Sequence, residues 1–112
     1  MTIDSSTLRL LIELAQQRRD TAAAGNAAAS AQRERAATTL QMLTDYRSEV
    51  REQSPASQGR VASRAQLQVL DRFAQRLDVA IDAQHRQHEL QQAAAAQAAA
   101  ELAARQRRLK AL

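Results

Sequence analysis

Apolar side chains recur every seven residues along the first half of the chain. This row contains no polar residue and consists mostly of alanine: Leu8, Ala15, Ala22, Ala29, Ala36, Leu43 and Val50. Such a strict recurrence is typical of a left-handed coiled-coil seam. A second row three or four residues away contains Leu11 or Ile12, then Leu40 and Tyr46, and it is weaker because polar residues lie between Ile12 and Leu40. The pattern predicts one long helix over about residues 6–53.

Two rows with the same spacing run through the second half. The first contains Leu67, Ala74, Ile81, His88, Ala95, Leu102 and Leu109, and the second Leu70, Leu77, Gln84, Gln91, Ala98, Arg105 and Leu112. Ser63 and Gln66 stand three residues apart, the spacing of a capping box at the start of a helix. The pattern predicts a second helix over about residues 63–112.

Turn-forming residues occur between the two predicted helices, at about residues 54–62. Pro55 disfavours helical geometry at Ser54, and Gly59 follows four residues later. A short connection makes two helices antiparallel neighbours, so residue i would lie opposite about residue 116 − i. This pairing sets large side chains against large ones at both ends and alanine against alanine between them. The sequence therefore predicts a single all-α domain over residues 1–112, an antiparallel two-helix coiled-coil hairpin.

Gly25 interrupts the first predicted helix. An internal glycine costs about 1 kcal/mol relative to alanine. The residue is either a tolerated imperfection, or a point where the two backbones approach closely or the helix bends.

Composition supports an elongated helical protein over a globular one. Tyr46 and Phe73 are the only aromatic residues among 112, and most of the 45% apolar share is alanine. Two aromatic side chains cannot anchor a large compact core. The chain has no cysteine, which excludes disulfides, and no apolar run or leader long enough for a membrane span or a secretory signal.

No arrangement of residues indicates catalysis. There is no glycine-rich phosphate loop and no Ser-His-Asp set, so we expect no enzyme and no cofactor. His85 and His88, with Glu89 beside them, are better interpreted as surface polarity than as metal ligands, so no metal is expected. Carboxylates such as Asp78 and Asp82 are expected on the outer helix face, as partners of nearby cations.

Basic residues gather where the hairpin would bring the two termini together. They are Arg9, Arg18, Arg19, Arg105, Arg107, Arg108 and Lys110. Such a cluster could bind an acidic protein surface, a nucleic acid or a membrane surface, or could simply be solvated. Nucleic acid is not the expected partner, because no aromatic residue lies near the cluster to stack on bases.

A second candidate surface lies near the turn. It comprises Leu43, Tyr46, Val50, Phe73, Leu77, Ala80 and Gln84. These side chains either clamp the hairpin together or, because two helices cannot cover every large side chain, present a docking patch.

The segments "QMLTDYRSEVREQ" and "LQVLDRFAQRLDVAIDAQ" resemble the FliJ family of flagellar export proteins. The family pattern has a leucine-rich start, then Leu-x-x-Tyr-Arg-x-Glu, a turn containing glycine, and Phe-x-x-x-Leu-x-x-Ala-Ile. The matching positions are Leu8, Leu11, Ile12 and Leu14, then Leu43, Tyr46, Arg47 and Glu49, then Gly59, and finally Phe73, Leu77, Ala80 and Ile81.

This resemblance implies a non-enzymatic stalk of a hexameric export ATPase, located in the cytoplasm at the flagellar base. It also implies partners: the ATPase, the cytoplasmic domain of the membrane export gate, and export chaperones. The gate-binding residues would be Leu43, Tyr46, Phe73, Leu77, Ala80 and Gln84, and the basic end would dock in the ATPase ring. Val50 stands where many members have a second tyrosine, so gate affinity is expected to differ. The corresponding stalk of a virulence injectisome has the same architecture and remains an alternative.

Overall fold

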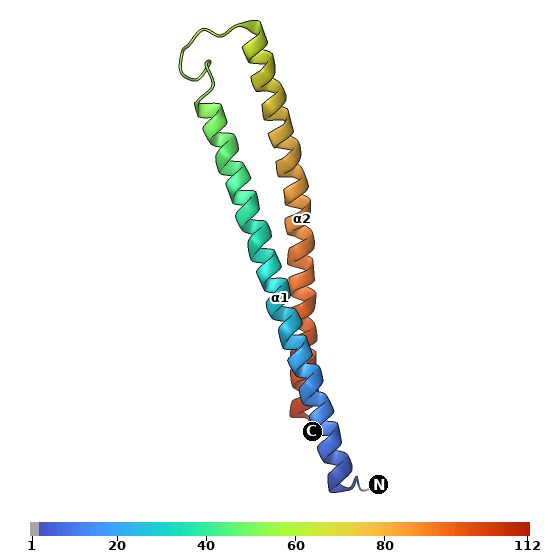
Figure 1. The fold of residues 1–112 in the computed structure, drawn as a ribbon. Helices are drawn as coiled ribbons and strands as arrows, with labels where there is room; N and C mark the ends of the chain where they lie inside the picture. Colours follow the sequence, from blue (N-terminus) through green and yellow to red (C-terminus); the bar gives the residue numbers. More distant parts are fainter. Residues whose placement is uncertain (1–2) are drawn as a thin grey trace. The chain divides into compact units, whose positions relative to one another are not determined.

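The chain forms two α-helices joined by a loop, and the computed structural model describes residues 3–112 (Figure 1). Helix α1 spans Ser5–Glu52 and helix α2 spans Arg64–Lys110. These bounds lie within two residues of the helices expected at 6–53 and 63–112. The described residues contain no strand. The predicted all-α helical hairpin is confirmed.

Both helices begin with side chains that satisfy free backbone N–H groups. The N–H of Thr7 donates to Asp4 Oδ1 at 2.7 Å, so Asp4 is the N-cap of α1. That bond lowers the pKa of the Asp4 carboxyl below its ordinary value. At α2, the N–H of Gln66 donates to Ser63 Oγ at 3.1 Å, and the N–H of Ser63 donates to Gln66 Oε1 at 2.9 Å. The capping box expected from the sequence is therefore present.

The loop is held by its own hydrogen bonds. The hydroxyls of Ser54 and Ser57 both donate to the carbonyl of Arg51, at 2.9 and 2.8 Å, which satisfies one of the last carbonyls of α1. Further along, Gly59 has φ of +66°, a conformation that other residues adopt only at a cost. The loop therefore ends α1 and reverses the chain with a defined backbone.

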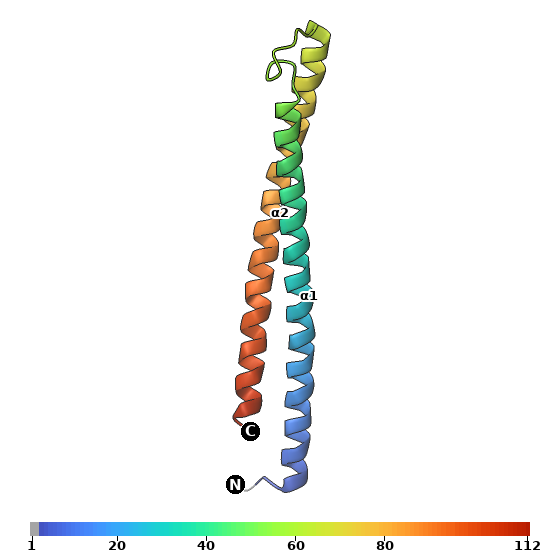
Figure 2. The same ribbon diagram turned by 90° about the vertical axis from the view of Figure 1, so that its left-hand side faces the viewer.

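Two compact units make up the chain, and each contains a part of both helices. We call residues 34–90, which include the loop, the loop unit. Residues 1–33 and 91–112 form the terminal unit, which contains both chain ends. Within each unit a segment of α1 packs beside a segment of α2 (Figures 1 and 2).

The loop unit is held together by its larger side chains. Leu77 of α2 is buried with 7% of its surface exposed, and Ala36 of α1 with 6%. The other residues turned toward the facing helix are half-buried: Leu40, Leu43, Arg47, Val50, Leu70, Ala74, Ile81, Gln84 and His88. Their spacing alternates between three and four residues, as the predicted seven-residue rows require. One member of the second row of α1 was predicted wrongly, because Arg47 and not Tyr46 turns toward the facing helix.

The terminal unit is held mainly by small side chains. Ala95 is its most buried residue, with 3% of its surface exposed. Half-buried residues continue the same spacing: Ile12, Ala15, Arg19, Ala22, Asn26, Ala29, Gln91, Ala98, Leu102, Arg105 and Leu109. The second row of α1 is thus Ile12, Arg19 and Asn26 here, which explains why the sequence showed it only weakly. Leu8, at the end of the first row, is exposed.

Gly25 lies on the exposed side of α1 in the terminal unit. Apart from its chain neighbours and the backbone of its own helix, a Cβ atom built there would have no atom within 4 Å. The alternative of a close backbone approach at this residue is therefore wrong. The glycine gives no packing advantage in exchange for its lower helix propensity.

The pairing of the two helices differs by about one turn from the expected sum of 116. In the loop unit the numbers of the paired residues Tyr46 and Phe73 add to 119. Those of Ala36 and Gln84 add to 120. The expected pairing assumed that the loop divides evenly about residue 58. Instead, a sum near 120 sets Glu52, the last residue of α1, opposite residue 68, so the first turn of α2, which begins at Arg64, extends beyond the end of α1.

Candidate functional site

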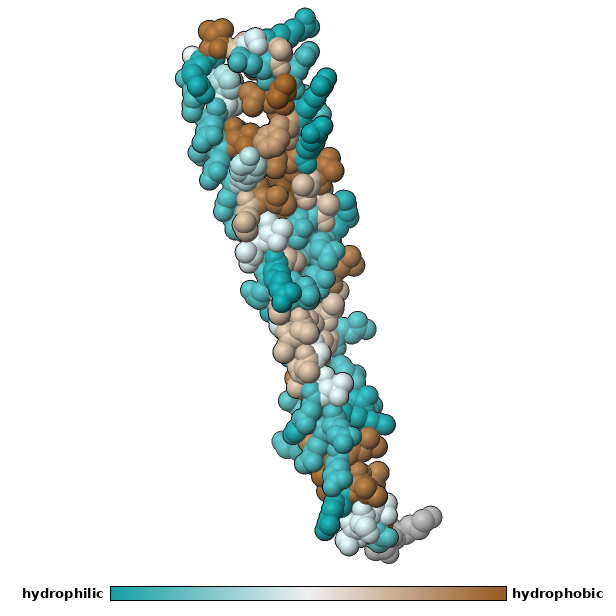
Figure 3. Space-filling view, in the orientation of Figure 1, coloured by the Kyte–Doolittle hydropathy of each residue, from teal (hydrophilic) through white to brown (hydrophobic). Residues whose placement is uncertain are grey.

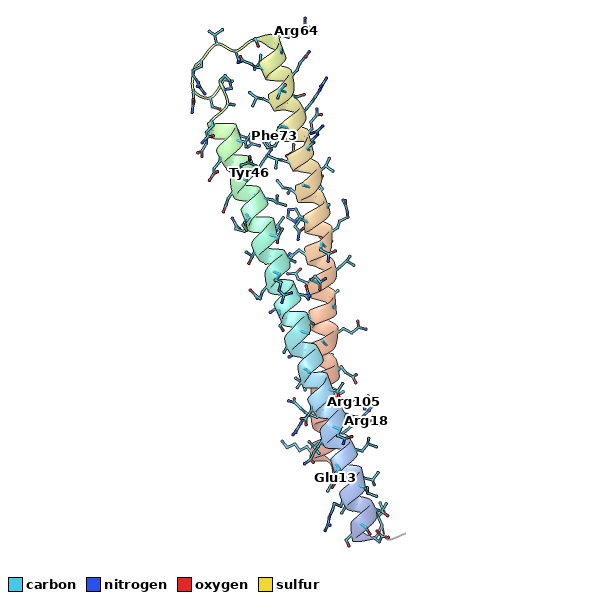
Figure 4. All side chains as sticks on the ribbon, in the orientation of Figure 1. Glu13, Arg18, Tyr46, Arg64, Phe73 and Arg105 are labelled. Carbon is cyan, nitrogen blue, oxygen red and sulfur yellow. The ribbon has the colours of Figure 1, made fainter. Side chains whose placement is uncertain are left out.

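The two aromatic residues of the chain meet in the loop unit. Tyr46 of α1 and Phe73 of α2 point toward one another, with ring centroids 6.0 Å apart and planes at 85° (Figure 4). This edge-to-face geometry is favourable for an aromatic pair. Even so, 47% of Tyr46 and 37% of Phe73 remain exposed. The pair can therefore hold the two helices together and also contact a partner with its exposed ring surface.

The rest of the predicted gate-binding patch lies deeper than its two rings. Leu43, Ala80 and Gln84 are half-buried, and Leu77 is buried between the helices. Gln84 Nε2 donates to the carbonyl of Ala36 on α1, at 3.5 Å. Apolar side chains gather along this helix pair near the loop (Figure 3). Tyr46 and Phe73 are thus the members that can contribute most surface to a partner, while Leu77 supports them from beneath.

An ion pair joins the helices beside these rings. Arg47 Nε donates to Asp78 Oδ1 at 2.8 Å, with 20% of the arginine side chain and 56% of the aspartate side chain exposed. The bond lowers the pKa of Asp78 and raises that of Arg47, in each case chiefly through the hydrogen bond. Asp78 was expected only to occupy the outer face. That interpretation was incomplete, because it considered partners on the same helix, whereas Asp78 reaches across to α1.

A basic groove lies in the terminal unit. It has a volume of about 360 Å³, and its apolar lining comprises Leu11, Leu14, Ala15, Ala111 and Leu112. Arg18 of α1 and Arg105 and Arg108 of α2 complete the lining, so both helices contribute cations to it (Figure 4). The leucines keep substantial exposure, 39% for Leu11 and 43% for Leu14. The groove therefore combines apolar surface with positive charge, which suits an acidic and partly apolar protein segment.

The predicted basic cluster is only partly gathered in this groove. Arg9, Arg19, Arg107 and Lys110 do not line it. Two of the seven cations are offset by carboxylates, since Arg19 pairs with Asp20 at 2.8 Å and Arg105 with Glu101 at 2.7 Å. These pairs reduce the long-range attraction for a polyanion such as nucleic acid.

The described residues show neither a metal-ligand cluster nor a membrane-spanning helix. Residues 3–112 contain no group of three or more His, Asp or Glu side chains that could hold a metal ion. In the same range, neither helix has a stretch long and apolar enough to cross a bilayer.

The chain matches the model of the family described as flagellar FliJ protein over residues 5–112. The match covers both helices, the loop and both surfaces described above. The chain belongs to the flagellar FliJ family. FliJ family membership assigns it to flagellar protein export at the flagellar base. Searches of curated proteins and of solved structures found no match.

Proposed function

We propose that the chain is a non-enzymatic, cytoplasmic component of flagellar export that connects a hexameric export ATPase to the membrane export gate. The observation that carries this proposal is the FliJ family match over residues 5–112. The hairpin serves as the stalk of the ATPase ring and also escorts export chaperones. Two separate surfaces support a linking role: an aromatic pair in the loop unit and a basic groove in the terminal unit.

The aromatic pair is the proposed contact with the export gate. Exposed aromatic side chains in a well-packed setting are typical interface anchors. We expect Phe73→Ser or Tyr46→Ser to weaken binding of the gate's cytoplasmic domain at least about 30-fold, equivalent to ~2 kcal/mol. Binding is measured by pull-down and calorimetry, with circular dichroism to check helicity. Leu77 is a poor choice for this test, because its burial would confuse lost binding with lost stability.

Val79→Ser provides the matched control for the gate experiment. Val79 lies on the same helix as Phe73 and is 67% exposed, outside the patch. Its replacement should leave gate binding unchanged. Undiminished binding by the Phe73 and Tyr46 variants would remove this half of the proposal.

The basic groove is the proposed contact with the ATPase ring. The test is co-purification with the hexameric ATPase from the same genome, with ATP turnover measured with and without the chain. Arg18→Gln together with Arg108→Gln should reduce association several-fold, since rim charges act mainly on the association rate. Arg35→Gln together with Arg86→Gln, which removes two exposed cations of the loop unit, is the matched control. Equal effects of the two replacements would assign the loss to net charge and not to the groove.

Two alternatives are separated by simple observations. The family match is to a flagellar protein, which favours flagellar export over an injectisome stalk. A basic helical module for nucleic acid or a membrane surface predicts binding that falls steeply with salt. Weak, salt-insensitive retention on DNA and on anionic vesicles would exclude it.

A further inference from the structure

A hollow of about 570 Å³ lies in the loop unit, between the loop and the first two turns of α2. In Figure 1 the loop arches from the green end of α1 to the yellow start of α2. The lining residues belong to neither the aromatic pair nor the basic groove. They are mainly apolar: Pro55, Val61, Ala62, Ala65, Val69 and Leu70, with Gln53, Arg60 and Gln66.

The walls of this loop hollow are set by hydrogen-bonded backbone. On the loop side, the N–H of Arg60 donates to the carbonyl of Pro55 at 2.8 Å, next to the positive φ of Gly59. On the helix side, the Ser63–Gln66 capping box sets where α2 begins. A partner entering the hollow would therefore meet a largely preformed surface, which lowers the entropic cost of binding.

Two apolar side chains of the hollow remain largely open to solvent. Val61 is fully exposed, at 101%, and Val69 is 65% exposed. Most of their apolar surface therefore takes no part in packing within the loop unit. Covering these two valines with apolar side chains of a partner would bury surface that the chain itself leaves in water.

Positive charge predominates in the sequence that forms the hollow and continues along α2, and one arginine, Arg60, lines the hollow itself. Residues 53–76 contain four arginines, Arg60, Arg64, Arg72 and Arg76, and one acid, Asp71, which gives a net charge of +3. Within residues 3–112 none of the four forms an ion pair, and the only hydrogen bond shown for them besides backbone bonds runs from Arg60 to the carbonyl of Gln53. The spacing of Ala65, Val69, Arg72 and Arg76 places them along one stripe of α2. The first two residues of this stripe, at the hollow, are apolar, and the next two are arginines.

We infer that the loop hollow binds an acidic amphipathic helix of a partner protein. The apolar face of that helix covers Val61 and Val69, and carboxylates on its flanks reach the four arginines. A helix is favoured over a bilayer surface, because its protruding side chains can enter the hollow. This site is separate from the proposed gate and ATPase contacts, so it can succeed or fail independently of them.

The experiment uses the full chain with isotope-labelled valine and leucine methyl groups. The probe is a synthetic helix of about 18 residues, or five turns, with leucine every three or four positions and glutamate on both flanks. A matched peptide carries lysine in place of glutamate. We expect the glutamate peptide alone to shift the methyl signals of Val61, Val69 and Leu70 in a saturable way. Raising the salt from about 0.05 to about 0.3 M should weaken this binding about five-fold.

Two exposed valines of α2 allow a matched pair of variants. Val69→Ser should weaken peptide binding about ten-fold, whereas Val79→Ser, which replaces an equally exposed valine outside the hollow, should not change it. An equal loss in both variants, or equal binding of the lysine peptide, would overturn the inference. It is also overturned if neither peptide moves these methyl signals. If anionic phosphatidylserine vesicles then bind the chain and Val61→Ser abolishes that binding, the surface is a membrane contact.

Discussion

The loop unit and the terminal unit are built from the same two helices but are held together by different side chains. The loop unit contains Leu77 between its helices, the Tyr46–Phe73 ring contact and a cross-helix ion pair. In the terminal unit the most buried residue is an alanine, Ala95. Large side chains bury more apolar area and tolerate fewer alternative registers than alanine does. The loop unit therefore contributes more of the hairpin's stability, while the terminal unit leaves leucines such as Leu11 and Leu14 exposed.

The largest expected effect is the loss of a large side chain from the loop unit. Leu77→Ala should lower the free energy of unfolding by about 2–4 kcal/mol, because it removes transfer energy and leaves a cavity. Thermal and urea unfolding followed by circular dichroism measure this change. In the terminal unit Leu14→Ala should cost less than about 1 kcal/mol, since 43% of Leu14 is already in water. Equal losses would show that the two units do not differ in how they are stabilised.

The second-largest expected effect comes from adding a large side chain to the terminal unit, where the helices leave little space between them. Ala95→Leu should destabilise the chain by about 1–3 kcal/mol, because three more carbon atoms must fit where 3% of the surface is exposed. Ala93→Leu is the matched control, since Ala93 is exposed on the same helix. If Ala95→Leu left the free energy of unfolding in urea unchanged, the helices would have to be loosely packed around Ala95.

Much of this difference between the units could be predicted from the sequence. The seven-residue rows placed Leu77 and Ala95 between the helices, because the side-chain period of a coiled coil depends only on local spacing. Ser63 and Gln66 fixed the start of α2 for the same reason, as a capping box is a contact between residues three apart. The register could not be predicted as well. It depends on how far the start of α2 is offset from the end of α1, and turn chemistry alone does not specify that offset.

The candidate surfaces, too, could be predicted only in part, because contacts between residues distant in sequence depend on the register. Tyr46 and Phe73 were expected to lie close together, and they do, because a shift of one turn still leaves large side chains facing each other. The bridge from Asp78 to Arg47 was missed, since its partners are 31 residues apart in sequence. The loop hollow was missed as well, although a run of residues from Gln53 to Leu70 with two arginines and no acid was a visible signal.

The two glycines, one in each unit, should respond in opposite directions to the same substitution. Gly25→Ala should stabilise the terminal unit by about 1 kcal/mol, because the position is helical, exposed and free of neighbours within 4 Å. Gly59→Ala should destabilise the loop unit by about 1–2 kcal/mol, because φ of +66° crowds a Cβ atom against the backbone. Urea unfolding measures both changes. Matching signs would mean that one of these backbone conformations is not maintained in solution.

The smallest expected change in stability comes from the acid sensitivity of the Arg47–Asp78 bridge. This bridge lies in the loop unit. Arg47 lowers the pKa of Asp78 in the folded chain, so the folded state favours the carboxylate more than the unfolded state does. The stability that results is fully present above the ordinary aspartate pKa of about 3.9 and is lost as the pH falls through the lower folded value. Asp78→Asn should therefore reduce stability slightly at neutral pH and make the decline below about pH 4 shallower than in the wild type. Asp82→Asn removes an exposed carboxylate four residues along the same helix and should keep the wild-type decline. Unfolding curves recorded from about pH 7 down to about pH 2 would contradict the bridge's role if the two variants followed the same pH dependence.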